Sequence, residues 1–279
     1  MSRESNIEVI TDTLHQCRSN PALAAAIDAS VAAQTFIAQD DAFPAALPRY
    51  ATPAAVVVSR KRTFAAAMGY PGQKVAVLNF ASATTPGGGV LKGSNAQEEC
   101  LCRCSTLYPC LTVPEMYDAF YAPNLRSANV LHTDDCLHTP GVVVFKSDTY
   151  HPQTLPPEQW YAVDVITCAA PNLRDMPGNE MNAESGAAMA DYPADKLHAL
   201  HVQRLRRVLD IAAAHGAQVV ILGAFGCGAF RNDPAVVAHA MAEVTREYRR
   251  MFRTIEFAVY CRPDDDENYR VFRAAMETL

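Results

Sequence analysis

Apolar runs of strand length alternate with helical patterns along most of this chain. Continuous Val, Ile and Leu runs predict buried strands over about 55–59, 74–80, 142–145, 161–168, 218–222 and 254–260. Apolar residues at three- and four-residue steps predict helices over about 60–68, 96–107, 195–215, 234–252 and 267–277. Because buried strands separated by amphipathic helices are typical of a mixed or mainly parallel sheet covered on both faces, we expect an α/β sandwich.

The first 50 residues follow a different pattern. Ile7, Ile10 and Leu14 fall at helical spacing, the Ala-rich segment after them does the same, and a group of prolines precedes the first convincing strand. We therefore predict a helical extension over 1–50 and a main domain over 51–279. The segment 177–193, rich in Gly, Asn, Ala and Met, is expected to be a long surface loop.

Composition narrows the class of protein. A chain of 279 residues with 49% hydrophobic residues can bury one large core, and no stretch of about 18 uncharged apolar residues is present. We expect no membrane partner and a cytoplasmic location, because the amino terminus does not resemble a signal peptide. A net charge of -6 argues against a broad basic surface that grips nucleic acid.

The nine cysteines are an odd number and are expected to be reduced thiols. Cys100, Cys102 and Cys104 alternate, with Cys110 following, which raises the question of a metal site. Positions two apart on a helix diverge by about 200°, so these thiols would not converge on one ion. We expect no metal here.

The glycine triplet Gly87, Gly88 and Gly89 follows an apolar strand and precedes Gln97-Glu98-Glu99. Consecutive glycines let the backbone approach a ligand closely, and the two carboxylates can carry out proton transfer. A plain turn is the alternative for the glycines, and first-turn acids favoured by the helix dipole are the alternative for the carboxylates. Adjacent residues at a helix start point about 100° apart, so both glutamates cannot flank one glycosidic bond. Glycosidic chemistry would then rest on one working acid, with its neighbour orienting the substrate.

A second glycine-rich loop, 223–230, follows the strand 218–222 and precedes a helix with Pro234 near its start. Such a loop can aim several backbone N–H groups at a pyrophosphate, although simple close packing explains the same pattern. It fits neither the Rossmann nor the Walker A spacing. Phe225 and Phe230 are either core residues or an aromatic wall beside a ribose. We expect His198 and His201 to be surface or core residues. A solvated helix face is expected for Arg204, Arg206 and Arg207.

These motifs together resemble the bacterial-type poly(ADP-ribose) glycohydrolases, which are built on a macrodomain. The matching segments are 77–83, Pro86-Gly87-Gly88-Gly89, Gln97-Glu98-Glu99, 101–108, 168–172 and the loop 223–230. The resemblance implies a macrodomain-like three-layer α/β/α sandwich with a mixed sheet, and a catalytic domain over 51–279. It also implies a metal-independent enzyme, and we expect no cofactor.

By this resemblance Glu99 would protonate the leaving oxygen of a ribose–ribose bond and then activate water, while Glu98 would hold the ribose hydroxyls. Gln97 would help to fix the catalytic loop, Gly87 to Gly89 would approach the terminal ADP-ribose, and Phe230 would pack against a ribose. The implied substrate-binding set is Asn79, Ser82, Gly87, Gly88, Gly89, Val90, Gln97, Gly226, Cys227, Gly228, Ala229 and Phe230.

The resemblance implies hydrolysis of the ribose–ribose bonds of poly(ADP-ribose), free or on ADP-ribosylated proteins, from the chain ends with release of ADP-ribose. One alternative is a macrodomain reader that binds ADP-ribose without turnover. Another is an enzyme that removes mono-ADP-ribose from a protein or nucleic-acid acceptor.

Overall fold

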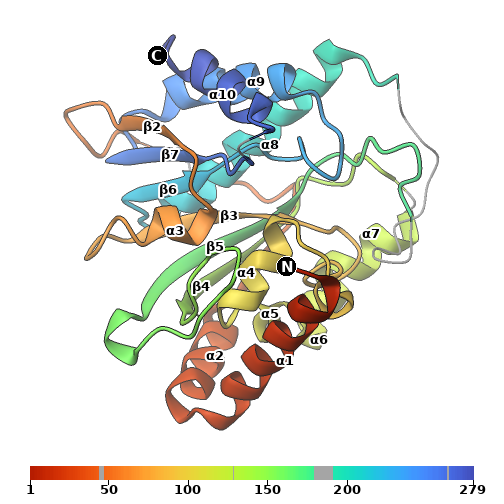
Figure 1. Ribbon diagram of the computed structural model, residues 1–279. Helices are drawn as coiled ribbons and strands as arrows, with labels where there is room; N and C mark the ends of the chain where they lie inside the picture. The colour runs from red at the N-terminus through yellow and green to blue at the C-terminus, as the bar shows by residue number, and fades with distance from the viewer. Residues whose placement is uncertain (44–46, 128, 179–190, 263) are drawn as a thin grey trace.

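A seven-stranded mixed sheet forms the centre of the molecule in the computed structural model (Figure 1), with strand order β1-β4-β5-β3-β6-β7-β2. The structure describes residues 1–43, 47–127, 129–178, 191–262 and 264–279. The strands are β1 (Thr35–Ile37), β2 (Ala55–Ser59), β3 (Val75–Ala81), β4 (Cys136–Val144), β5 (Tyr161–Ala169), β6 (Val219–Leu222) and β7 (Thr254–Ala258).

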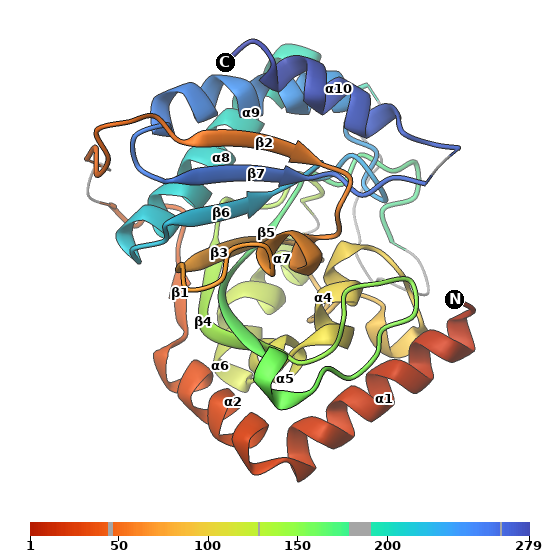
Figure 2. The ribbon, with the colours of Figure 1, turned by 60° about the vertical axis from the view of Figure 1, so that its left-hand side comes forward.

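Helices lie on both faces of this sheet, as Figure 2 shows from a second side. They are α1 (Arg3–Ser19), α2 (Pro21–Ala33), α3 (Thr63–Ala67), α4 (Gln97–Cys104), α5 (Leu107–Leu111), α6 (Pro114–Met116), α7 (Ala122–Ser127), α8 (Ala194–Ala214), α9 (Pro234–Tyr248) and α10 (Glu267–Met276). The short helices η1 (Val90–Lys92) and η3 (Pro157–Gln159) and a π-helical turn, η2 (Tyr117–Tyr121), complete the set.

The pairing of the strands explains why the central runs are apolar throughout. β3 pairs in parallel with both β5 and β6, and β7 pairs in parallel with β6 and β2. Of the seven residues of β3, six are buried, because helices cover both of its faces. One core packs α8, α9 and α10 against the sheet, and a second packs α1, α3, α4 and α5 against its other face. The predicted three-layer α/β/α sandwich with a mixed sheet is confirmed.

The amino-terminal segment contains more than the predicted helices. Ser2 and Asn20 cap α1 and α2 with their side chains, as expected at helix starts. After α2, however, β1 pairs antiparallel with β4 and extends the sheet. A strand of three residues is too short to show a period in the sequence. The division at residue 50 stays a prediction.

The strand predicted at 142–145 is longer than expected, since β4 begins at Cys136. Pro140 and Gly141 interrupt the strand pattern in the sequence, so the first half of β4 was not predicted. The register of the β4–β5 pair shifts between Thr139 and Val142. An irregularity of this kind accommodates Pro and Gly inside a strand. The short helices between 107 and 127 were also not predicted, while most of the expected loop at 177–193 lies outside the described residues.

The prediction for Arg204 was wrong. Its side chain is 1% exposed and pairs with Asp134 at 2.7 Å. Its other donors reach the carbonyl oxygens of Leu131 and Ala169 at 3.1 and 2.7 Å. Because α8 packs this turn against the sheet, the guanidinium of Arg204 is shielded from solvent and donates to protein acceptors instead. Arg206 does lie at the surface, with a side chain 44% exposed.

None of the helices in the described part of the chain combines the length and the apolar character needed to cross a membrane.

Candidate active site

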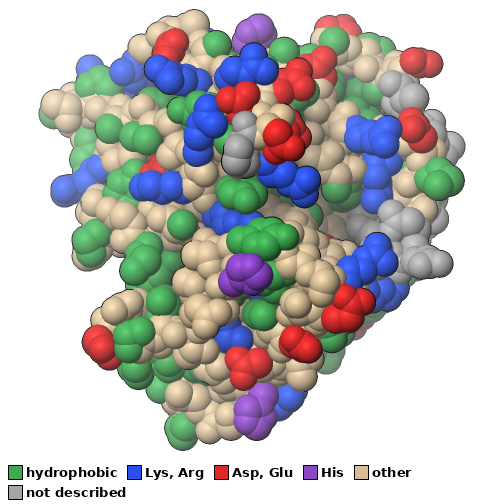
Figure 3. All heavy atoms as spheres, viewed as in Figure 1, with side chains coloured by type: hydrophobic (Ala, Val, Ile, Leu, Met, Phe, Trp, Pro, Cys, Tyr) green, Lys and Arg blue, Asp and Glu red, His purple; other side chains and the backbone are tan. Residues whose placement is uncertain are grey.

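A cavity of about 1080 Å³ lies at the carboxyl ends of β3, β6 and β7, beside the first turn of α4. Ligands bind at this edge in open α/β sheets. Figure 3 shows the molecule hollowed at its centre, with Lys and Arg side chains around the hollow. Four arginines line the cavity, and so do Glu98, Glu99, Asp148 and Asp265. Burial raises the pKa of Glu98, Glu99 and Asp148, so the cavity is less negative than its carboxyl groups suggest.

Glu99 is the third residue of α4, and its carboxylate reaches back past the start of that helix. One oxygen accepts a hydrogen bond from the N–H of Ala96 at 3.0 Å, and the other accepts from the N–H of Gly89 at 2.9 Å. The side chain is only 7% exposed yet borders the cavity. The glycine segment and the helix therefore hold this one carboxylate between them.

The backbone of Gly88 shows why the central position of the glycine triplet needs a glycine. Its φ is +56°, a conformation that side chains rarely adopt. A Cβ at this position would lie 2.6 Å from Glu99 Oε1 and 3.2 Å from Glu98 Oε2. The backbone of Gly88 thus lies close to the carboxyl groups of Glu98 and Glu99. A glycine that only permitted a turn would not need this close approach.

Glu98 lies deeper and is 2% exposed. Its carboxylate accepts hydrogen bonds from the N–H of Ser82 at 2.8 Å and from Asn79 Nδ2 at 3.2 Å. Burial raises its pKa well above the ordinary value, and the neighbouring charge of Glu99 adds to this rise. Burial also raises the pKa of Glu99, against the opposing effect of the N–H of Gly89. Two adjacent carboxyls in this environment favour retaining a proton.

Gln97 joins the first turn of α4 to the end of β3. Its Oε1 accepts from the N–H of Phe80 at 2.9 Å, while its Nε2 donates to the carbonyl of Leu78 at 2.8 Å. A third hydrogen bond, to Thr63 Oγ1 at 3.0 Å, ties the same amide to α3. Both ends of the amide thus bind protein, which fits a positioning role.

The second glycine loop presents unused donors to the cavity wall. In the described part of the chain, the N–H groups of Gly226, Gly228, Ala229 and Phe230 donate to no protein acceptor. All four residues line the cavity. Successive free N–H groups in a glycine-rich turn are suited to the oxygens of a phosphate or pyrophosphate.

Asn232 fixes the shape of that loop. Its Nδ2 donates to the carbonyl oxygens of Gly226 and Phe230, each at 3.2 Å, and its Oδ1 lies 2.8 Å from His201 Nε2. His201 is 1% exposed, so of the two expected positions, surface or core, it occupies the core. Asp233 caps α9 by accepting from its first N–H groups, so an anion would meet the loop rather than the helix end.

The structure brings most of the predicted site residues to one cavity. Those on its wall are Ser82, Gly88, Gly89, Gln97, Glu98, Glu99, Gly226, Gly228, Ala229 and Phe230. Asn79, Gly87, Val90 and Cys227 do not line it and stand behind the wall, where Asn79 supports Glu98. Phe225 packs in the core with 3% exposure and also lines the cavity.

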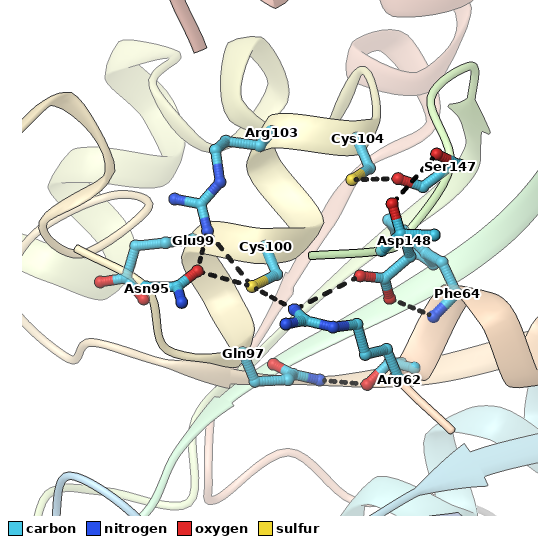
Figure 4. Close-up of polar contacts among 12 residues, drawn as sticks. Arg62, Phe64, Asn95, Gln97, Glu99, Cys100, Arg103, Cys104, Ser147 and Asp148 are labelled. Atoms are coloured by element: carbon cyan, nitrogen blue, oxygen red, sulfur yellow. Dashed lines mark hydrogen bonds and ion pairs between the residues drawn. The ribbon is translucent and has the colours of Figure 1, made fainter. Parts of the chain in front are cut away.

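Several cavity residues escaped the sequence analysis. The guanidinium of Arg62 lies 4.2 Å from the ring centroid of Tyr260 and 3.9 Å from Asp148 Oδ1. It also donates to Cys100 Sγ at 3.1 Å, so Figure 4 shows it between α4 and Asp148. No motif joins positions 62, 148 and 260, because only the fold brings their segments together. The described residues contain no group of three His, Cys, Asp or Glu side chains suited to a metal.

The fold and this site define a macrodomain-like protein with a buried carboxyl pair at its ligand cavity. A search of curated proteins found no match. The family model for the catalytic domain of microbial-type poly(ADP-ribose) glycohydrolase (PARG) matches residues 5–147. The chain therefore belongs to the microbial-type poly(ADP-ribose) glycohydrolase family.

Solved structures agree with this assignment. The glycohydrolase of Thermomonospora curvata is 29% identical with a TM-score of 0.83, over 98% of this chain and 99% of that one. The structure of the same enzyme bound to the inhibitor ADP-HPD is 29% identical in sequence with a TM-score of 0.80, over 97% of this chain and 99% of that one. The glycohydrolase of Deinococcus radiodurans in complex with ADP-ribose is 32% identical with a TM-score of 0.74, over 90% and 97%.

Proposed function

We propose that this protein hydrolyses the ribose–ribose bonds of poly(ADP-ribose) from the chain ends and releases ADP-ribose, with Glu99 as the acid and then the base. One observation carries the proposal: the buried carboxyl pair and the loop with free N–H groups line the same cavity. The first supplies proton transfer, and the second supplies donors for a pyrophosphate.

The raised pKa of both glutamates favours keeping one proton on the pair. When Glu98 accepts hydrogen bonds from the ribose hydroxyls, those donors favour its charged form. The proton is then better placed on Glu99, which gives it to the departing oxygen as the bond to the anomeric carbon breaks. The resulting Glu99 carboxylate takes a proton from the attacking water.

The preference for chain ends rests on the amino-terminal helix. Arg3, the first residue of α1, lines the cavity next to Ser94, Asn95 and Ala96. The segment before the catalytic turn and the start of α1 thus form one continuous wall. A polymer that had to pass through this side would meet backbone and side chains, whereas a terminal unit need only enter from the open side.

Product analysis on end-labelled poly(ADP-ribose) tests the proposal. Wild type should release ADP-ribose from the first time points, with no oligomers of intermediate length. Glu99→Gln should still bind ADP-ribose but release it from polymer far more slowly than wild type. Robust ADP-ribose binding without any product from wild type would instead show a reader, and loss of the final protein-linked unit would show a mono-ADP-ribosyl hydrolase.

A further inference from the structure

Arg103 is a buried arginine at the end of α4, with a relative exposure of 2%. Its guanidinium turns back along the helix, as Figure 4 shows. It donates to the carbonyl of Ser94 and to Asn95 Oδ1, both at 2.6 Å, and to Cys100 Sγ at 3.2 Å. The last turn of α4 is therefore connected directly to the loop that precedes its first turn.

That loop controls the surroundings of Glu99. Ser94, Asn95 and Ala96 all line the cavity, and the N–H of Ala96 donates to Glu99 Oε2 at 3.0 Å. The direction of this N–H depends on the two residues before it, which are the two that Arg103 binds. In the described part of the chain Arg103 makes no ion pair with a carboxylate, but its charge lowers the pKa of Glu99 against the effect of burial.

Helix α1 holds the same segment from outside. Thr13 Oγ1 donates to the carbonyl of Arg103 at 2.6 Å, and Asn6 Nδ2 donates to the carbonyl of Gly93 at 3.0 Å. Both contacts are buried and join positions 90 and 87 residues apart. The segment 93–103 is thereby fixed at each end, and Arg103 closes it internally.

We propose that Arg103 is a positioning residue of the glycohydrolase reaction, which holds the 94–96 loop so that the Glu99 carboxyl keeps its place at the cavity wall. The proposal rests on the function proposed above. Arg103 does not line the cavity and acts through Ala96 and Glu99.

The expected effect on proton transfer has a definite direction. The positive charge of Arg103 and the N–H of Ala96 both favour the charged form of Glu99. Loss of the arginine therefore raises the pKa of Glu99 further. Activity that needs protonated Glu99 falls as pH rises through this pKa, so the alkaline limb of the pH profile should move to higher pH while kcat decreases.

The test compares Arg103→Met with Arg103→Lys in the full chain. Arg103→Met should lower kcat on the order of 10²-fold, because a misplaced carboxyl loses its alignment, and leave KM nearly unchanged. It should also move the alkaline limb upward. Arg103→Lys keeps the charge but not the two-pronged contact, so kcat should fall with a smaller shift of that limb.

The control is Arg204→Met, which removes another buried arginine, one that contacts neither α4 nor the loop before it. Arg204→Met should lower the melting temperature without moving the alkaline limb of the pH profile. Titration of the Glu99 carboxyl carbon by ¹³C NMR provides a readout that does not need activity. If wild type fails to cleave the polymer, the proposed function fails, and the NMR shift in Arg103→Met still decides the position of Glu99.

Wild-type kcat and an unchanged Glu99 titration in folded Arg103→Met would overturn the proposal. If Arg103→Met does not fold, Arg103→Lys decides, and wild-type kcat with an unchanged titration in that variant overturns it equally.

Discussion

The two glycine-rich loops of the cavity use their backbone in opposite ways. In the first, the N–H of Gly89 is already bound to Glu99, and the backbone of Gly88 lies against both glutamates. In the second, the N–H groups of Gly226, Gly228 and Ala229 have no protein acceptor in the described part of the chain. The first loop fixes the carboxylate of Glu99, and the second leaves these donors unused by the residues that the structure describes.

This difference teaches that a run of glycines does not by itself indicate what the backbone approaches. Gly88 avoids a clash with carboxyl groups, whereas Gly226 avoids one with Ala170 and Asn232 while its neighbours face the cavity. Changes in the first loop should therefore affect turnover, and changes in the second should affect affinity for ADP-ribose.

The largest effect is expected for Glu99→Gln. The amide nitrogen cannot carry the proton, and it cannot accept one of the two N–H bonds that Glu99 now accepts from Gly89 and Ala96. Release of ADP-ribose from polymer should fall by about 10² to 10⁴, measured in single turnover. Binding of ADP-ribose by calorimetry serves as the control and should change little. Equal losses of rate and affinity would contradict the separation of the two loops.

Gly226→Ala should act in the opposite sense. Its φ is +79°, and a Cβ would lie 2.8 Å from both Ala170 Cβ and Asn232 Nδ2. A strained residue of this kind costs about 1–3 kcal/mol, so the affinity for ADP-ribose should fall about tenfold or more, with a smaller change in kcat at saturation.

Gly72→Ala is the matched control, because Gly72 also has a positive φ of +73° but nothing within 4 Å of its Cβ position. It should lower stability through the backbone alone and leave the affinity for ADP-ribose intact.

Acid should lower the stability of the fold through two buried histidines, His201 and His132. Burial lowers the pKa of His201 to about 4 and that of His132 to about 3. Between these values and the ordinary value near 6.5, the unfolded chain binds more protons than the folded one, so stability falls as pH decreases. Each histidine should contribute a slope of about 1.4 kcal/mol per pH unit in that window.

Urea titrations between pH 7 and pH 5 measure this slope. His201→Gln keeps an amide opposite Asn232 and should make the slope shallower. An identical slope in the variant would show that His201 is not the group that titrates.

The smallest effect concerns the first loop. Thr13→Val removes the hydroxyl that donates to the carbonyl of Arg103 and should cost about 1 kcal/mol of stability. It should also reduce kcat while leaving the affinity for ADP-ribose unchanged, because the hydroxyl of Thr13 supports the helix that carries Glu99. Thr112→Val is the control, since that hydroxyl bonds to its own turn at the surface. Equal changes in melting temperature for both variants would contradict a special role of Thr13.

Much of the fold was accessible from the sequence where the local pattern was strong. The run 75–81 is buried on both faces and reads as a strand without any tertiary information. Only the second half of β4 was predicted, because Pro140 and Gly141 break the pattern and pairing with β5 is what makes the first half a strand. Arg204 was assigned to solvent, because a charge at helical spacing is usually exposed, and the packing of α8 reversed that expectation.

The site divides in the same way. Gln97, Glu98 and Glu99 were recognisable because their spacing from the glycine triplet is local to the chain. Arg62, Asp148 and Tyr260 were not, since they come from segments far apart in sequence.

The sequence by itself determined the family, the mixed α/β fold and the paired glycine loops, because short-range spacing and periodicity encode these features. Only the tertiary structure decided that the N–H of Gly89 in the first loop donates to Glu99, whereas N–H groups of the second loop donate to no acceptor in the described part of the protein. It also decided that Arg103 reaches back to Ser94 and Asn95. The reason is physical: whether a donor is used depends on which acceptor the folded chain places within about 3 Å of it, and spacing along the chain does not specify that distance.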